Sequence, residues 1–164
     1  MRSRIFYVLL VIGIIGLSFK TIDHMNEEST SYKCMVQLVN YDGEGAYIIT
    51  SLMDPEGKYE KTLYVVGEDD EWYHLIDEWW TYFGREKRSL DGITGATVGG
   101  GERKVYTFEV ENKYVDQGYK IRFETSVEDQ KYHPIDLELG LNSELPSKPV
   151  KGSGYIRYVR MMPN

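Results

Sequence analysis

The sequence predicts a mainly β protein, an immunoglobulin-like antiparallel β-sandwich of about seven strands with one inserted amphipathic helix. Three observations predict this fold. Apolar and polar residues alternate with a period of two along most of the chain. The composition, with 14 tyrosines, favours strands. The period changes to that of a helix only once after the amino terminus, near residue 70.

The first 20 residues predict a signal peptide or an N-terminal membrane anchor. Arg2 and Arg4 precede an uncharged run of 15 residues, 5–19, which we expect to form a hydrophobic helix and which Lys20 closes. Charge followed by an apolar run is typical of a secretory signal. The run is shorter than the ~20 residues of a spanning helix, and no clear cleavage site follows it, so cleavage and retention are both open.

Beyond this segment, residues 21–31 are expected to form a polar tether and residues 32–164 a single domain. After residue 20 the chain has 16 basic and 26 acidic side chains, because three of its 19 basic residues come earlier, and its net charge there is −10. Such acidity disfavours nucleic acid and anionic lipid as partners. We therefore expect no nucleic-acid partner, and membrane contact only through the N-terminal segment. The expected location is extracytoplasmic, either periplasmic or anchored to the inner membrane facing the periplasm.

Three strands are expected before the helix. Residues 32–39 alternate between apolar and polar, and residues 46–53 are apolar on both faces, as in a central strand. Residues 59–66 are expected to pair with 46–53 as a hairpin, because Asp54-Pro55-Glu56-Gly57 has the preferences of a type I turn. Cys34 is the only cysteine, which excludes an internal disulfide, and its place in an alternating stretch predicts a core residue.

The helix is predicted at about residues 70–83, where apolar residues recur on one face. This face consists of Trp72, Leu75, Ile76, Trp79, Trp80 and Phe83. Asp69 or Asp70 can cap its start and Gly84 can end it. Two interpretations of the aromatic face are open: it packs the helix onto a sheet, or part of it borders a flat ligand.

Four further strands are expected after the helix. Alternation predicts them around Tyr106–Val110, Tyr119–Val127, Ile135–Leu141 and Tyr155–Met161. Charged residues between the apolar ones, such as Glu124 and Asp136, are expected on the solvent-facing sides of their strands.

A long segment without periodicity, residues 85–102, separates the helix from these strands. Loops of this length inside compact domains are usually functional or disordered, and Gly99-Gly100-Gly101 is interpreted as a hinge. The loop contains Asp91-Gly92-Ile93-Thr94-Gly95-Ala96-Thr97, which we expect to be a flexible, sterically open peptide that presents a hydroxyl to another molecule. The alternative is an ordinary surface loop in which Asp91 and Thr94 make local turn hydrogen bonds.

This segment resembles the pattern Asp-x-x-Thr/Ser-Gly-Ala-Thr/Ser, to whose last hydroxyl residue bacterial flavin transferases attach FMN through its phosphate. All seven positions match. The resemblance implies that Thr97 is the attachment residue and that the transferase recognises Asp91, Thr94, Gly95 and Ala96. It also implies that FAD is the donor, with a magnesium ion at the transferase.

A wider resemblance covers most of the chain after the tether. It is carried by Thr62-Leu63-Tyr64-Val65-Val66-Gly67, by Trp79-Trp80, by Asp91–Thr97 and by the alternating strands that follow. These features are similar to a family of predicted periplasmic proteins of unknown function, labelled flagellar hook-assembly-like, with an immunoglobulin-like fold. Its members occur with PepSY-type membrane proteins and flavin transferases, which the resemblance implies as partners.

These expectations favour an extracytoplasmic flavoprotein-type electron carrier with FMN covalently bound to Thr97. The alternative is a cofactor-free immunoglobulin-like binding or scaffolding module of the cell envelope. We expect no catalytic residues and no metal site, because the sequence has no nucleophile and base arrangement and no histidine ligand spacing. A carrier is therefore favoured over an enzyme with its own substrate site.

Overall fold

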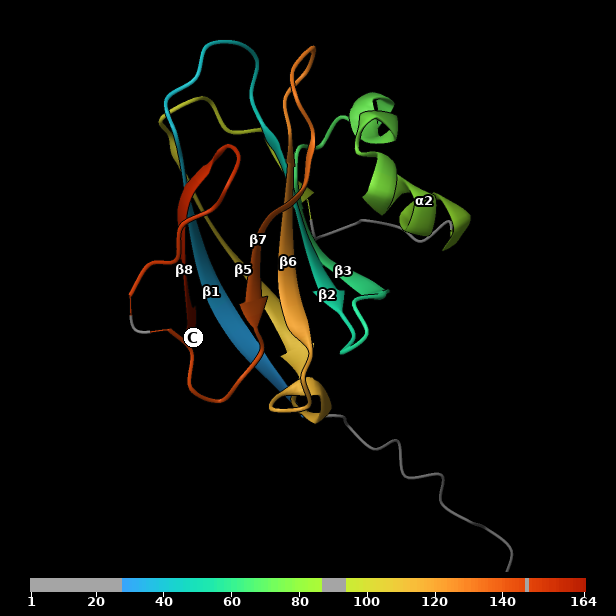
Figure 1. Ribbon diagram of the computed structural model, residues 1–164, viewed down its shortest axis with the longest axis vertical. Coiled ribbons are helices and arrows are strands. Elements are labelled where there is room, and N and C mark those ends of the chain that lie inside the picture. The colour runs from blue at the N-terminus through green and yellow to red at the C-terminus, as the bar shows by residue number, and fades with distance from the viewer. Residues whose placement is uncertain (1–27, 87–93, 147) are drawn as a thin grey trace, which may run out of the picture.

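The computed structural model describes residues 28–86, 94–146 and 148–164. In these residues, two sheets pack face to face (Figure 1). Their strands are β1 (Ser29–Leu38), β2 (Tyr47–Met53), β3 (Tyr59–Val66), β4 (Thr94–Gly95), β5 (Arg103–Glu111), β6 (Lys120–Ser126), β7 (His133–Gly140) and β8 (Ile156–Pro163). One sheet has the order β5-β1-β8 and the other β4-β3-β2-β6-β7. The predicted mainly β, two-sheet sandwich is confirmed.

The core lies between the sheets, where alternate residues of each strand point inward. On β1 these are Tyr32, Cys34, Val36 and Leu38, all buried. Burial raises the pKa of the Cys34 thiol to about 12, so Cys34 is an unreactive core residue as expected. The mostly antiparallel pairing follows from short connections such as the β2–β3 turn, where the Gly57 N–H donates to the Asp54 carbonyl over 3.0 Å. The predicted hairpin is confirmed.

The helical region differs from the single helix predicted at 70–83. It consists of a 3-10 helix, η1 (Asp70–Leu75), followed by an α-helix, α2 (Asp77–Glu86). They are separated at Ile76, whose backbone leaves the helical region with φ −101° and ψ 68°. The Asp69 carboxylate caps η1 by accepting the Glu71 N–H over 3.2 Å.

The two helices cover the outer face of the five-stranded sheet, with α2 on the right in Figure 1. A second apolar cluster, which we call the satellite cluster, lies between the helices and this sheet. It consists of Tyr47, Ile49, Val65, Tyr73, Ile76, Trp79 and Phe83. Trp79 is fully buried there, and its indole N–H donates to Thr62 Oγ1 over 2.7 Å. For Trp79, the prediction that the aromatic face packs onto a sheet is confirmed.

Two carboxylates expected to face solvent are buried instead. Glu124 is 3% exposed, because the helices cover its side of the sheet, and it accepts a hydrogen bond from the Tyr132 hydroxyl. Asp136 is 2% exposed and accepts from Thr125 Oγ1 and from the backbone N–H groups of the β7–β8 connection. Buried carboxylates need such donors to offset their desolvation.

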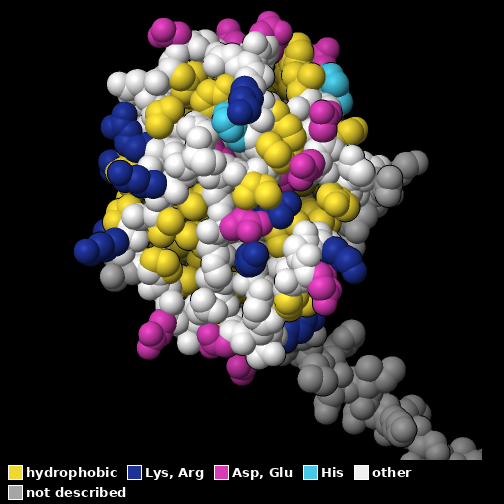
Figure 2. Space-filling view, in the orientation of Figure 1, with side chains coloured by type: hydrophobic (Ala, Val, Ile, Leu, Met, Phe, Trp, Pro, Cys, Tyr) yellow, Lys and Arg dark blue, Asp and Glu magenta, His cyan; other side chains and the backbone are white. Residues whose placement is uncertain are grey.

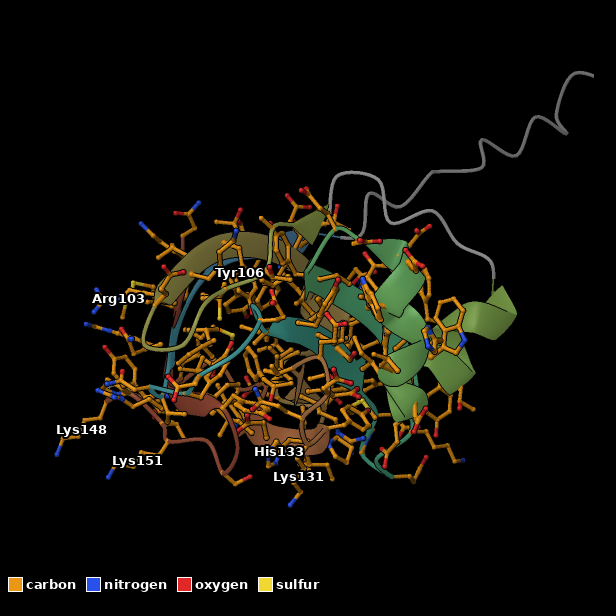
Figure 3. The ribbon with its side chains drawn as sticks, turned by 90° about the horizontal axis from the view of Figure 1, so that it is seen from above. Arg103, Tyr106, Lys131, His133, Lys148 and Lys151 are labelled. Carbon is orange, nitrogen blue, oxygen red and sulfur yellow. The ribbon has the colours of Figure 1, made fainter. Side chains whose placement is uncertain are left out.

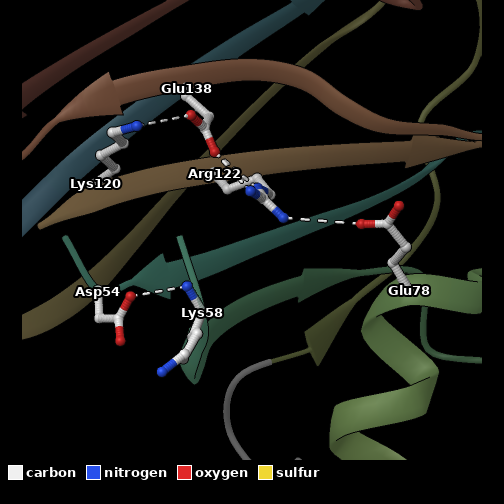
Figure 4. A network of polar contacts seen from close by, with 6 residues as sticks. All are labelled: Asp54, Lys58, Glu78, Lys120, Arg122 and Glu138. Atoms are coloured by element: carbon white, nitrogen blue, oxygen red, sulfur yellow. Dashed lines mark hydrogen bonds and ion pairs between the residues drawn. The ribbon is translucent and has the colours of Figure 1, made fainter. Parts of the chain in front are cut away.

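A polar network beside Glu124 ties α2 to the sheet (Figure 4). The Arg122 guanidinium lies 2.8 Å from a Glu138 carboxylate oxygen and 3.8 Å from a Glu78 carboxylate oxygen of α2. Lys120 also pairs with Glu138, over 3.4 Å. The same view shows the β2–β3 turn, where the Lys58 N–H donates to the Asp54 carboxylate over 2.8 Å.

The chain enters the sandwich at the base of β1. This strand begins at Ser29, inside the stretch 21–31 predicted as a tether. The predicted N-terminal hydrophobic helix, and with it the signal peptide or anchor at 1–20, lies outside the described residues. Within the described ranges, no helix has the length and apolar character needed to span a membrane.

Candidate functional site

The predicted attachment segment lies along an edge of the five-stranded sheet. Thr94 and Gly95 form β4, which runs parallel to β3 beside Val65 and Val66. The Gly95 carbonyl accepts a hydrogen bond from the Gly67 N–H. Asp91, the first residue of the predicted motif, lies outside the described residues. Its predicted role in transferase recognition stays a prediction.

Val98 holds the other end of the segment. It is 3% exposed, and its backbone pairs with Ala46 through hydrogen bonds of 2.7 Å and 3.2 Å. Ala96 and Thr97, both exposed, therefore lie between two paired positions. The expected flexible, open peptide is thus not what residues 94–98 form, because pairing with strand β3 and with Ala46 fixes their backbone.

Two side chains from neighbouring strands support the segment. The Lys104 ammonium donates to the Ala96 carbonyl over 3.1 Å, and the Tyr64 hydroxyl donates to the Thr94 carbonyl over 3.5 Å. The Tyr64 ring stacks on Tyr106 with centroids 4.3 Å apart, which fixes the ring position. Sequence reasoning missed both Lys104 and Tyr64, because each is an ordinary strand residue without a local signal.

The glycines after the segment form a packed turn and not the predicted hinge. The Glu102 N–H donates to the Gly99 carbonyl over 3.1 Å, and the Gly101 N–H donates to the Val39 carbonyl over 2.8 Å. A Cβ on Gly100 would lie 2.2 Å from the Tyr41 carbonyl oxygen. Gly100 is therefore needed for a close backbone approach, which leaves this turn little freedom to swing.

The position of the Thr97 side chain depends on Gly45. A Cβ at residue 45 would lie 2.5 Å from Thr97 Oγ1 and 2.7 Å from Thr97 Cβ. Real Cβ atoms do not approach other atoms this closely, so the threonine rests directly against the glycine backbone. The absence of a side chain at residue 45 thus determines where the Thr97 hydroxyl lies.

Thr97 borders a cleft of about 270 Å³. The other lining residues are Glu44, Gly45, Tyr47, Glu68, Asp69, Trp72, Ala96 and Glu128. Four of these carry carboxylates, whereas Tyr47 and Trp72 supply aromatic surface. The cleft thus combines an exposed hydroxyl, two aromatic rings and a strongly acidic lining.

The acidic lining affects the groups inside the cleft. Burial raises the pKa of the Tyr47 phenol, and the carboxylates of Asp69 and Glu128 raise it further. The Tyr47 hydroxyl donates to the Asp69 carbonyl over 3.3 Å. A further anion in this cleft would be repelled by the same carboxylates, whereas the Lys104 ammonium lies beside the segment, at the Ala96 carbonyl.

The three tryptophans take different positions. Trp79 is buried in the satellite cluster, Trp72 lines the cleft beside Thr97, and Trp80 is exposed on α2. Of the three, Trp72 is the one that lines the cleft, and the interpretation that part of the aromatic face borders a ligand stays a prediction. The described ranges contain no group of three or more histidine, cysteine or acidic side chains arranged to hold a metal ion.

Fold and site together define a small two-sheet β-sandwich domain with helices on one face and an acidic cleft beside an exposed threonine. Over residues 29–158 the chain matches the family described as Predicted periplasmic protein (DUF2271), and it belongs to this family. The match supports the extracytoplasmic location expected from the sequence. Searches of curated proteins and of solved structures gave no significant match.

Proposed function

We propose that this protein is an extracytoplasmic electron carrier whose FMN is attached to Thr97 by a flavin transferase. The observation that carries the proposal is a complete attachment motif that ends in an exposed hydroxyl at the border of a cleft. In the attachment step, Thr97 Oγ forms a bond to the FMN phosphorus of FAD. The pyrophosphate bond breaks, AMP leaves, and the hydroxyl proton is released.

The residues beside Thr97 fit such a group in two respects. Tyr47 and Trp72 offer aromatic surface to a flat ring, since rings attract one another in stacked or edge-on arrangements. The Lys104 ammonium lies beside the Ala96 carbonyl, where it offsets part of the charge of a phosphodiester at Thr97. FMN, when bound, supplies reversible electron transfer, while the protein positions it and tunes its electrostatics. Its partners under this proposal are the transferase and membrane redox proteins of PepSY type.

The test is intact-mass spectrometry of the full chain coexpressed with a flavin transferase in an exporting host. We expect a mass increase of one FMN minus water, mapped to the peptide that contains Thr97. Thr97→Ala should abolish the increase, and Thr97→Ser should retain it, because the motif accepts either hydroxyl. Thr107→Ala, which removes an exposed threonine outside the motif, is the matched control and should be modified like the wild type.

An unmodified wild-type mass, in cells where the transferase modifies a known acceptor, would contradict the proposal. A cofactor-free binding or scaffolding module of the cell envelope would then be the better account. Modification at a residue other than Thr97 would overturn the site assignment and leave only the flavoprotein class.

A further inference from the structure

The outward side of the three-stranded sheet has no covering element among the described residues. On β1, alternate residues such as Cys34 and Val36 point into the core. Lys33, Met35 and Gln37, which lie between or beside them, therefore point outward. The strand register places outward residues in three rows: Arg103–Gln37–Tyr158, Val105–Met35–Arg160 and Thr107–Lys33–Met162. This sheet therefore presents a broad surface of mixed basic and apolar side chains.

Six exposed cations gather on this side of the molecule, and we call them the basic face. They are Lys33 on β1, Arg103 on β5, Arg157 and Arg160 on β8, and Lys148 and Lys151 in the β7–β8 connection. Figure 2 shows Lys and Arg side chains along this edge, and Figure 3 shows Arg103, Lys148 and Lys151 on the same side. None of the six forms an ion pair with a described residue.

The basic face stands out because the chain beyond residue 20 has a net charge of −10. Acidic residues lie at its margin as well. They include Glu102, which precedes Arg103, Glu109, beside Ser29, and Glu144, which lines a groove together with Arg160. Unpaired like charges repel one another, so a surface of this kind is stabilised by an anionic partner.

Apolar side chains accompany these cations. Val105 is 48% exposed and Met162 is 36% exposed. A groove of about 580 Å³ beside Arg160 is lined in part by Leu145, Pro146 and Met162. Cations with apolar side chains among them are typical of surfaces that bind the headgroup region of a membrane.

We propose that the basic face rests on an anionic lipid surface, that of the membrane to which the N-terminal segment directs the chain. The entry point of the chain allows this orientation. The Glu28 carbonyl accepts the Asn112 N–H over 2.8 Å, so the chain joins the base of β1, the central strand of this sheet. If residues 5–19 form the anchor that the sequence predicts, the eight residues 20–27 have a maximum length of about 27 Å, enough for the sheet to lie flat beside it.

The proposal does not depend on modification of Thr97, and it revises the expectation that the membrane is contacted only through the N-terminal segment. Each cation near an anionic bilayer strengthens association by about fivefold at moderate ionic strength. Several cations on one rigid face therefore hold the domain against the surface even though its total charge is negative. The satellite cluster and α2, on the other sheet, then face away from the lipid.

The test is lysine acetylation of the full chain in lipid nanodiscs, read residue by residue by peptide mass spectrometry. One disc preparation contains phosphatidylcholine alone, and the other contains equal parts of phosphatidylcholine and phosphatidylglycerol. On anionic discs, labelling of Lys33, Lys148 and Lys151 should fall severalfold. Labelling of the exposed Lys58 and Lys131, which lie outside the basic face, should stay unchanged, and high salt should restore labelling of the first three.

Variants make the test specific. Lys33→Ser/Arg103→Ser/Arg160→Ser should abolish the protection of Lys148 and Lys151, whereas the matched Lys58→Ser/Lys113→Ser/Lys131→Ser variant should retain it. All substituted residues are exposed, so we expect both variants to fold. Equal labelling on both kinds of disc would overturn the proposal. Labelling that is reduced to the same extent on both kinds of disc, relative to the chain without discs, would also overturn it, because the lipid charge would then not matter. Protection that grows with the number of chains per disc would assign the face to a second copy.

Discussion

The position of the Thr97 hydroxyl depends on a neighbour that has no side chain. Gly45 lies against it, Val98 fixes the chain after it, and the Lys104 ammonium holds the carbonyl before it. Each contact comes from a different part of the sequence. The site is therefore sensitive to single atoms added at Gly45.

Gly45→Ala tests this dependence. The added Cβ would lie 2.5 Å from Thr97 Oγ1, so either Thr97 or the backbone near Ala46 must move. We expect the initial rate of flavin attachment to Thr97 to fall by about tenfold or more, since a misplacement of about an ångström has a large effect on group transfer. The measurement is a time course of intact mass with purified transferase and FAD.

Gly99→Ala is the control for this change. Its Cβ would lie 3.3 Å from the Glu102 carboxylate group, the far end of a flexible side chain that can shift by a few tenths of an ångström. We expect the attachment rate of this variant to match that of the wild type. An unchanged rate in Gly45→Ala would show that the contact between Gly45 and Thr97 does not govern the site.

Single residues also show where sequence reasoning stops. Alternation correctly placed Cys34 in the core, because the pattern reports which side of a strand is apolar. It placed Glu124 and Asp136 in solvent, because the pattern does not report what covers the polar side. Helices cover Glu124, and the β7–β8 connection folds onto Asp136. Lys104 was missed because its contact with Ala96 depends on tertiary placement.

Among the elements, α2 depends on a buried carboxylate beneath it. Burial raises the pKa of Glu124 to about 7, against the opposing effects of the Tyr132 hydroxyl and the Arg122 guanidinium. The nearby Glu78 of α2 raises it further, and the Trp79 backbone N–H of the same helix favours the charged form. Between about pH 4.5 and pH 7 the folded protein therefore holds a proton here that the unfolded chain has released.

The sign of the effect on stability follows from this raised pKa. The contribution of the protonated Glu124 to the free energy of unfolding is fully present below about pH 4.5. It is lost as the pH rises through about 7. Glu124→Gln is neutral throughout and still accepts the Tyr132 hydrogen bond. The free energy of unfolding of the variant, relative to that of the wild type, should rise by on the order of 2 kcal/mol from about pH 5 to pH 8.

Urea unfolding at both pH values measures this difference. Glu56→Gln, which changes an exposed carboxylate in the β2–β3 turn, is the control and should follow the wild type at both pH values. If Glu124→Gln and wild type lost stability in parallel between the two pH values, Glu124 would not be the group responsible.

Among the elements, the β2–β3 hairpin was predictable from the sequence, whereas the break between η1 and α2 was not. Residues 54–57 carry a turn signal of their own, which sets the β2–β3 register within a few residues. The break at Ile76 has no comparable signal, because the apolar spacing of the segment suits one continuous helix. Tyr73 before the break and Trp79 after it both pack in the satellite cluster, a tertiary arrangement that the local spacing does not report.

Over the whole molecule, the two apolar clusters differ in how they are enclosed. The main core is sandwiched between two sheets, whereas the satellite cluster lies between one sheet and the helices η1 and α2, with Tyr59 and Tyr132 packed against it. Elements with fewer buried contacts open locally at lower free energy. We expect backbone amides of α2 to exchange with deuterium about tenfold or more faster than those of β1 and β2.

Hydrogen exchange followed by peptide mass spectrometry measures this, with the β1 and β2 peptides as internal references. Equal protection of α2 and β2 would show that the helices and the sandwich unfold as one unit. Faster exchange in both η1 and α2, with the strands still protected, would show that the acidic cleft, which includes Trp72 of η1, has a wall that can open without unfolding of the sandwich.

The distribution of charge is a property of the whole molecule that composition conceals. A net charge of −10 predicted an acidic surface, yet the cations of the basic face come from residues spread between 33 and 160 and meet only in the folded sheet. The mainly β class was predictable because it depends on local alternation. The gathering of cations was not, because it depends on strand order.

The contacts around Thr97 also bear on the stage of export at which flavin can be attached. Gly45 and Ala46 precede it in the chain and Lys104 follows it, so these groups surround the threonine only after the strands have paired. Under the proposed function, a chain still in transit across the membrane offers only the seven-residue motif. Loading with flavin would then select mature molecules over incomplete ones, and the prosthetic group would serve as a record of successful folding.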